Sequence, residues 1–168
     1  MLEFSDFQCP FCNRFANDVW PTVKHEYVDA GRVQVAFRHL PLVKLHADAW
    51  RAAEAAECAN RQGQFWAMHD ALFAAPNDLS AEAITKKAQG LSLNQESLSG
   101  CLQGAATERV KQDAALATRL KLTGTPSFII GRIAGDNEMS PISVLQGAQP
   151  VEEFRKALDK AIAIVRKG

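Results

Sequence analysis

The feature that most constrains this chain is a pair of cysteines two residues apart, in Cys9-Pro10-Phe11-Cys12. Proline suits the first position of a helix, where its missing N–H would have no partner, so we expect a helix to begin at Cys9 and Pro10. The unpaired N–H groups and the positive dipole end at a helix start stabilise a thiolate. The pattern therefore favours Cys9 as a reactive thiol, with Cys12 one turn later placed to attack a disulfide formed at Cys9.

The same C-x-x-C pattern is also half of a common zinc site, and that alternative needs a second closely spaced pair of ligands. The other cysteines, Cys58 and Cys101, stand far apart. The histidines form no such pair either: they are His25, His39, His46 and His69. Redox chemistry is the favoured interpretation. A zinc-binding structural module is the alternative, and metal analysis of the purified protein tests it.

A strand, a helix and a second strand are expected around the cysteines. The opening residues 2–5 predict the end of a strand, and the β-branched, apolar segment 33–40 predicts a buried one. Pro21 should kink or divide the intervening helix, and Gly31 should end it. One apolar stripe at helical spacing is formed by Phe11, Phe15, Val19 and Val23.

The middle of the chain, from about residue 45 to 122, is rich in alanine and predicts helices. We place them at 47–60, 65–75, 81–89, 95–102 and 105–120. Strands are expected again at 126–130 and 142–146, on either side of a polar turn at 135–138, and an amphipathic helix at 151–166. This order of β-α-β, helical block and β-β-α predicts an α/β fold with an inserted helical domain.

A second motif, Thr123-Gly124-Thr125-Pro126, precedes the strand that follows the helical block. Together with Glu3-Phe4-Ser5-Asp6-Phe7-Gln8-Cys9-Pro10-Phe11-Cys12, it resembles the DsbA-like branch of the thioredoxin superfamily, over nearly the whole chain. The resemblance implies a thioredoxin-like α/β fold. Residues 1–44 and 123–168 would form the thioredoxin-like domain, and residues 45–122 the inserted helical domain.

The resemblance also implies roles for individual residues. Cys9 would be the exposed attacking cysteine and Cys12 the buried resolving one. Pro126 would be a cis-proline facing the disulfide, the alternative being an ordinary trans-proline at the start of a strand. Thr125 would offer its backbone to a substrate peptide in a strand-like pairing.

Apolar side chains beside the cysteines would receive unfolded polypeptide. We expect this groove to involve Phe7, Pro10, Phe11 and the loop near Pro126. Phe11 departs from the family, because DsbA enzymes usually carry histidine there to help stabilise the thiolate. Phe supplies neither charge nor hydrogen bond, so we expect Cys9 to be less perturbed and the protein to be less oxidising.

Glu3 lies six residues before Cys9, where this superfamily often places a buried acid. Such a carboxylate could relay a proton to or from Cys12. The alternative is a solvent-exposed glutamate at a frayed terminus.

Two further groups of residues fall in the helical block. Cys58 and Cys101 would form either a structural disulfide or two buried free thiols. An aromatic cluster there has the helical spacing of core residues rather than of a ligand site; its members are Phe65, Trp66, Met68, Leu72 and Phe73.

Composition bounds the function further. Lys plus Arg and Asp plus Glu both total 19, a balance that argues against a nucleic-acid partner. No apolar run approaches the roughly 20 residues that cross a bilayer. The chain opens with no signal peptide, yet the segment that begins at Leu2 looks like the end of a strand whose first residues are missing. We therefore expect a leader to have been removed and a periplasmic or otherwise extracytoplasmic location, with the cytoplasm as the alternative.

These features predict a thiol–disulfide oxidoreductase, specifically a DsbA-like oxidase that passes a Cys9–Cys12 disulfide to reduced, unfolded polypeptides. The resemblance implies a DsbB-like membrane quinone reductase as reoxidant. We expect no bound cofactor, no metal and a monomer. One alternative is a disulfide reductase or isomerase of the same fold, and another is a glutathione-dependent transferase or isomerase acting on small molecules.

Overall fold

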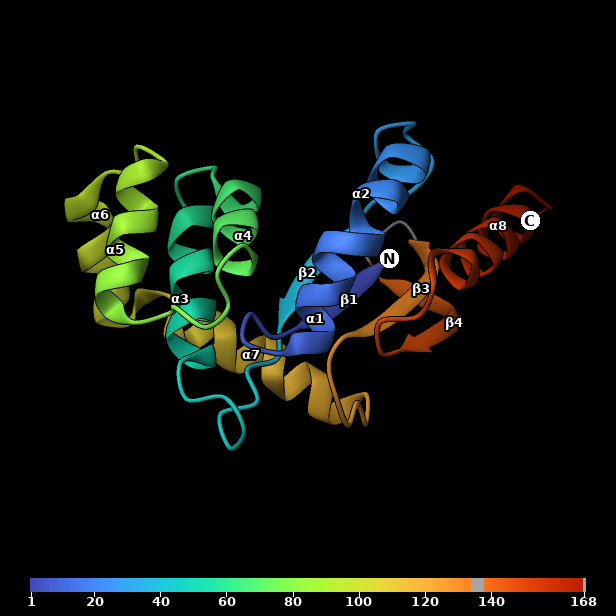
Figure 1. The fold of residues 1–168 in the computed structure, drawn as a ribbon. Helices are drawn as coiled ribbons and strands as arrows, with labels where there is room; N and C mark the ends of the chain where they lie inside the picture. Colours follow the sequence, from blue (N-terminus) through green and yellow to red (C-terminus); the bar gives the residue numbers. More distant parts are fainter. Residues whose placement is uncertain (134–137, 168) are drawn as a thin grey trace.

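A four-stranded mixed sheet lies beside a group of short helices in the computed structural model, which describes residues 1–133 and 138–167 (Figure 1). The strands are β1 (Leu2–Ser5), β2 (Ala36–His39), β3 (Ser127–Ile133) and β4 (Met139–Gln146), in the order β2-β1-β3-β4. β1 runs parallel to β2, and β3 is antiparallel to both β1 and β4. This arrangement confirms the predicted α/β fold with a helical insertion.

The strand bounds differ from the sequence prediction at several ends. β2 stops at His39, before the predicted Leu40, and β4 begins at Met139, three residues earlier than predicted. Residues 33–35 precede β2 instead of belonging to it. Gly131 does not end the third strand but lies inside β3, at a shift in its register with β4. A Cβ atom at Gly131 would collide with the Ser140 carbonyl, so the strand continues there because the residue has no side chain. Most of the predicted polar turn at 135–138 lies outside the described residues.

One face of the sheet is covered by the helical segment that follows the cysteines and by the last helix, α8 (Val151–Lys167). The first segment consists of α1 (Pro10–Arg14), the π-helical η1 (Phe15–Val19), α2 (Trp20–Val23) and the π-helical η2 (Lys24–Val28). Pro21 stands in the first turn of α2, where π-helical pairing changes to α-helical pairing, and the segment stays helical without a gap from Pro10 to Val28, so the helix is not divided there. The rings of Phe15, Phe128 and Phe154 pack together, with centroids 4.5–5.1 Å apart.

The other face of the sheet is covered by α7 (Thr107–Arg119), whose Ala117 packs with Phe4 and Ile129. α7 also contacts the helical block. That block contains α3 (Ala49–Asn60), α4 (Phe65–Phe73), α5 (Ala81–Gly90), α6 (Gln95–Gly100) and the π-helical η3 (Cys101–Ala105). α7 therefore packs against both the sheet and the helical block. The division into a thioredoxin-like domain (1–44 and 123–168) and an inserted helical domain (45–122) stays a proposal.

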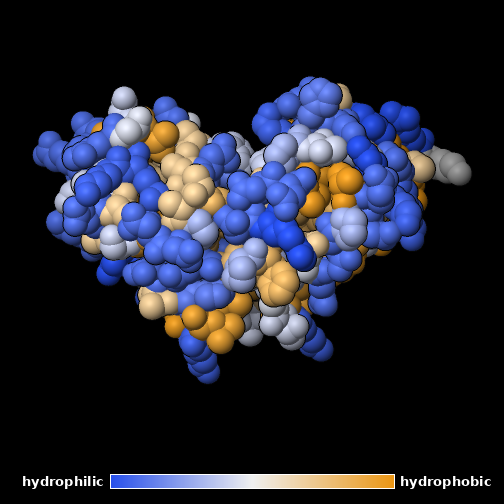
Figure 2. Space-filling view, in the orientation of Figure 1, coloured by the Kyte–Doolittle hydropathy of each residue, from blue (hydrophilic) through white to orange (hydrophobic). Residues whose placement is uncertain are grey.

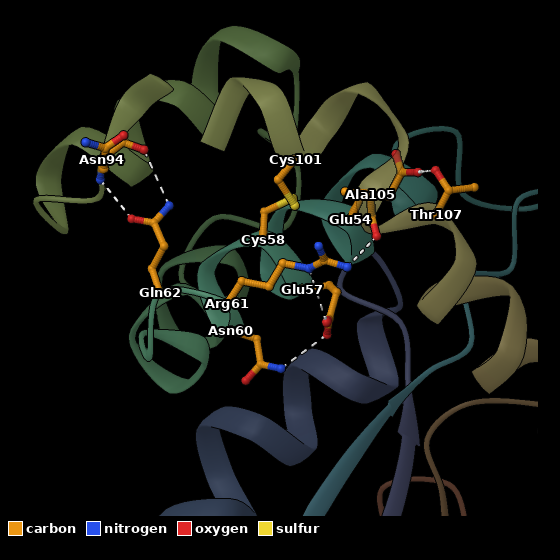
Figure 3. The surroundings of a disulfide bond; sticks show 10 residues. All are labelled: Glu54, Glu57, Cys58, Asn60, Arg61, Gln62, Asn94, Cys101, Ala105 and Thr107. Carbon is orange, nitrogen blue, oxygen red and sulfur yellow. Dashed lines mark hydrogen bonds and ion pairs between the residues drawn. A yellow bond between two sulfur atoms is a disulfide. The ribbon is translucent and has the colours of Figure 1, made fainter. Parts of the chain in front are cut away.

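The helical block is held together by alanine packing and by a covalent link. Cys58 on α3 and Cys101 on η3 form a disulfide with Cα atoms 5.7 Å apart (Figure 3). Close to it, the Gln62 side chain accepts a hydrogen bond from the Asn94 N–H, and Arg61 donates to the Ala105 carbonyl. The buried side of α3 is almost entirely alanine, which brings the neighbouring helices near enough for this bond.

The aromatic cluster of the helical block is mostly core, as its spacing predicts. Met68, Leu72 and Phe73 are buried and Phe65 packs against them. Trp66 is the exception, because it is partly exposed and stacks on Trp20 of α2 with ring centroids 5.2 Å apart. This stacking joins the helical block to the helices beside the sheet.

Candidate active site

The site is built where β1 ends and α1 begins. Cys9 is the residue that precedes the first turn of α1, and Pro10 occupies the first helical position, as predicted. The Cys9 N–H donates to the Asp6 carbonyl at 3.1 Å, which closes the turn before the helix. Cys9 and Cys12 are free thiols, so the structure shows the reduced form.

The loop before β3 lies against Cys9. The Thr125–Pro126 peptide bond is cis. The Cys9 thiol donates to the Thr125 carbonyl at 3.5 Å, across 116 residues of chain. The two sequence motifs, far apart along the chain, therefore meet at one place.

The two cysteines differ little in accessibility. Cys9 keeps 4% of its surface exposed and Cys12 keeps 0%. The prediction of an exposed Cys9 is thus wrong, because the residue is buried. Cys9 remains the more accessible of the two cysteines.

The pKa values of the two thiols move in opposite directions. Interaction with the Cys12 thiol is the largest influence that lowers the pKa of Cys9, to about 5, and it outweighs the opposing effect of burial. The Thr125 side chain and the N–H groups of Cys12 and Phe11 act in the same direction. Burial raises the pKa of Cys12, and the neighbouring Cys9 raises it further. At neutral pH one sulfur is therefore a thiolate and the other a thiol.

Glu3 lies on the central strand β1 and is only 1% exposed, so the frayed-terminus alternative is wrong. Residues alternate between the faces of a strand, which puts Glu3 and Ser5 on one face. Both Glu3 Oε1 and Ser5 Oγ are buried with no hydrogen-bond partner among the described residues. Burial raises the pKa of Glu3 to about 8, while the nearby Ser5 hydroxyl offsets part of this shift.

The Ser5 hydroxyl also influences Cys12, whose pKa it lowers against the larger effect of burial. Ser5 is thus near both the carboxyl group of Glu3 and the thiol of Cys12. Glu3, whose raised pKa keeps its proton on at neutral pH, and Cys12 therefore share Ser5 as a neighbour.

Of the two phenylalanines expected in the apolar groove, Phe11 is exposed and Phe7 is buried. Phe11 is 54% exposed beside Cys9, and Pro10 is exposed as well. Phe11 is the exposed member of the predicted apolar stripe, whose other three members are buried. Phe7 is buried and packs its ring on Phe37 with centroids 5.2 Å apart, so it supports the site from within the core.

Sequence reasoning missed Asp6, whose side chain is fully buried. Its backbone N–H donates to Cys12 Sγ at 3.5 Å, and its carbonyl accepts from Cys9. Its carboxylate accepts from the N–H groups of Gln8 and Leu42, each at 2.8 Å, and lies 2.8 Å from His46 Nδ1. The sequence held one sign of this role: Asp6 is an acidic residue three positions before Cys9 and next to the apolar Phe7.

Two further observations concern the described part of the chain, residues 1–133 and 138–167. No group of three or more His, Cys, Asp or Glu side chains gathers there in a way that could hold a metal ion. No helix in it is both long and apolar enough to span a membrane.

Comparison with known proteins identifies the family of the chain and the known structures that share its fold. A family model described as Thioredoxin (Thioredoxin_4) matches residues 1–160. The chain belongs to this thioredoxin family. Its structure superposes on alpha-DsbA1 from Wolbachia pipientis with a TM-score of 0.83, over 99% of this chain and 88% of that one, at 24% identity. This superposition shows that the chain has the DsbA variant of the thioredoxin fold, with its helical insertion.

Two curated relatives of this thioredoxin family member differ in length. A probable disulfide bond formation protein D from Bacillus anthracis is 28% identical over 171 residues, which cover 96% of this chain and 73% of the relative. The Na(+)/H(+) antiporter NhaA 3 from Salinispora tropica is 37% identical over 133 residues, 77% of this chain. The chain spans only 20% of that antiporter, which thus carries a similar thioredoxin-like segment within a much longer protein.

Proposed function

We propose that this oxidoreductase works as an oxidase, transferring a Cys9–Cys12 disulfide to polypeptides that fold outside the cytoplasm. The observation that carries the proposal is the low pKa of Cys9, about 5. A stabilised thiolate favours the reduced enzyme and makes its disulfide a stronger oxidant. The name of the Bacillus anthracis relative, probable disulfide bond formation protein D, supports the same direction.

The first step is attack of a substrate thiolate on Cys9 Sγ of the oxidised enzyme. The Cys9–Cys12 bond breaks, a mixed disulfide forms at Cys9, and Cys12 leaves as a thiolate. Cys12 needs a proton at once, because burial raises its pKa. Glu3 is protonated at neutral pH, since burial raises its pKa to about 8. We assign Glu3 as the donor of that proton.

The second step is attack by another substrate thiolate on the substrate sulfur of the mixed disulfide. Cys9 leaves as a thiolate, which its low pKa favours. The substrate has then lost two electrons and gained a disulfide, and the enzyme has gained the two electrons as a dithiol. Return to the disulfide needs an external oxidant, for which we propose a membrane quinone reductase of the DsbB kind.

Pro10, Phe11, Thr125 and Pro126 would line the path of the substrate. The exposed Phe11 offers apolar contact beside Cys9. Thr125 offers backbone groups next to the thiol that reacts, which suits strand-like pairing with an extended peptide.

An extracytoplasmic location is supported by the Cys58–Cys101 disulfide. Such structural bonds persist in oxidising compartments and are rare in a reducing cytosol.

The test is oxidative refolding of a reduced model substrate, together with the equilibrium constant of the enzyme with glutathione. We expect wild type to accelerate refolding and Cys9→Ala to be inactive. A strongly reducing potential would overturn the oxidase assignment in favour of a reductase. Activity that survives in Cys9→Ala would overturn the whole mechanism.

A further inference from the structure

We propose that the turn of residues 42–46, called here the apolar turn, binds apolar side chains of the polypeptide whose cysteine reacts at Cys9. The inference rests on the proposed function and adds a second contact surface to it. The apolar turn lies between β2 and α3, outside both sequence motifs.

The apolar turn is fixed at both ends by one buried carboxylate. Asp6 Oδ2 accepts from the Leu42 N–H at 2.8 Å and lies 2.8 Å from His46 Nδ1. Within the turn, the N–H groups of Leu45 and His46 donate to the Leu42 carbonyl at 2.8 and 3.0 Å. A surface that is already ordered loses little conformational entropy when a partner binds.

The same aspartate connects the apolar turn to the reacting sulfurs. The backbone of Asp6 accepts a hydrogen bond from Cys9 N–H and donates one to Cys12 Sγ. Just beyond the turn, the Asp48 N–H donates to Gln8 Oε1 at 2.8 Å. The turn is therefore tied to the active-site loop by side chains of that loop itself.

Between its two anchored ends, the apolar turn presents side chains to solvent. Val43 is 53% exposed and Leu45 is 76% exposed. The loop that contains them is drawn in cyan at the bottom of Figure 1, below α3 and α7, and Figure 2 shows hydrophobic surface in the same lower region. Single exposed apolar residues are ordinary, but here two stand on one ordered turn that hydrogen bonds tie to the loop of the reactive cysteines.

A polypeptide suits this surface better than a membrane. Binding to a bilayer surface grows with apolar area and with basic charge, and the turn offers two apolar side chains and one lysine, Lys44. The reaction, in contrast, brings a peptide chain to Cys9 in every cycle. Residues on one side of the substrate cysteine would reach Phe11, and residues on the other side would reach the apolar turn.

The experiment measures the rate at which single-cysteine peptides reduce the oxidised enzyme. One peptide carries leucine and valine beside its cysteine, the second carries serine in their place, and dithiothreitol serves as a small thiol. The variant is Val43→Ser/Leu45→Ser. The matched control is Ile164→Ser/Val165→Ser, which removes two exposed apolar side chains from the far end of α8.

We expect wild type and the control to react faster with the apolar peptide than with the serine peptide, by about tenfold. The Val43→Ser/Leu45→Ser variant should lose most of that preference and keep its rate with dithiothreitol. An unchanged preference would overturn the proposal, and so would an equal loss with dithiothreitol, which would mean altered chemistry at Cys9.

The proposed function can fail separately. If wild type oxidises none of the peptides, the oxidase assignment falls and the docking proposal falls with it. If wild type oxidises both peptides equally well, only the docking proposal falls. Binding to phosphatidylglycerol vesicles that the variant loses, with unchanged peptide rates, would assign the apolar turn to a membrane surface and overturn the proposal.

Discussion

At the scale of single residues, the proposed chemistry rests on three ionisable side chains held in different protonation states. Cys9 has its pKa lowered, whereas burial raises the pKa of both Cys12 and Glu3. A low-pKa sulfur is a good leaving group, and a protonated acid beside a high-pKa sulfur can supply its proton. The different surroundings of the two sulfurs would thus make Cys9 the leaving group and Cys12 the sulfur that takes up a proton.

The first prediction concerns the Cys9 thiolate. Thiolate absorbance near 240 nm in the reduced protein should titrate with a midpoint near pH 5, the value to which interaction with Cys12 chiefly lowers the Cys9 pKa. Because the folded pKa lies below the unfolded one, the reduced form gains stability from this thiolate at neutral pH and loses it as pH falls through about 5. Cys9→Ser should abolish the transition; a midpoint near 8.5 would contradict the account.

The second prediction concerns Glu3, whose folded pKa lies above its unfolded value. An acid of this kind costs stability as pH rises from about 4.5 towards 8, so Glu3→Gln should stabilise the protein at pH 7, by at most about 3 kcal/mol. The gain should vanish near pH 4.5. The same variant should slow thiol–disulfide exchange at neutral pH.

Denaturant unfolding at several pH values checks the stability half of this prediction, and stopped-flow exchange checks the rate. Glu152→Gln, an exposed change in α8, serves as the control. An unchanged exchange rate in Glu3→Gln would remove the proton-relay role.

At the scale of elements, the start of α1 decides how oxidising the enzyme is. Cys9 precedes a short helix of five residues, and its thiolate is stabilised by N–H groups at that helix start. Phe11 points away from the core and lies near the Arg14 guanidinium, 5.4 Å from its ring centroid. The position that could add a charge beside Cys9 therefore carries an exposed apolar ring.

The third prediction follows from this position. Phe11→His should raise the reduction potential, by on the order of 30 mV, because a histidine can donate to the Cys9 thiolate or carry positive charge. Equilibration with glutathione measures the potential, with Phe11→Leu as the uncharged control. No rise would show that the helix start and the Thr125 loop dominate.

The sequence predicted these elements well where the pattern was local. The C-x-x-C helix start, the alanine-rich helices and the final amphipathic helix appear near their predicted places. Errors arose where tertiary contacts decide. Phe7 is buried because Phe37 and Phe73 pack around it, and Gly131 continues a strand because β4 passes too close for a side chain. The role of Asp6 depends on Leu42 and His46, which no local pattern connects to it.

At the scale of the whole molecule, the helical insertion is a covalently closed unit attached to the thioredoxin-like part. Its disulfide joins residues 43 positions apart, and Trp66 stacks on Trp20 across the boundary. The Cys58–Cys101 bond joins α3 to η3 within the helical block (Figure 3), whereas Cys9 and Cys12 are free thiols at the start of α1. The four cysteines thus divide into a reactive pair and a structural pair.

The fourth prediction concerns that structural pair. Cys58→Ser/Cys101→Ser should lower the free energy of unfolding by about 4 kcal/mol, because the bond closes a long loop in the unfolded chain. Oxidative refolding activity per folded molecule should be unchanged. In the oxidised, denatured wild type, thiol reagents should find no free cysteine; two free thiols would show that the second bond does not form.

The most direct test of the central claim is to trap the intermediate at Cys9. Cys12→Ser removes the resolving thiol, so a mixed disulfide with a cysteine peptide should accumulate, and peptide mapping by mass spectrometry locates it. The account predicts the peptide on Cys9 in nearly all of the trapped protein, and no adduct in Cys9→Ser. An adduct on Cys12 in Cys9→Ser that forms as fast as the one on Cys9 would contradict the assignment of Cys9 as the attacked sulfur.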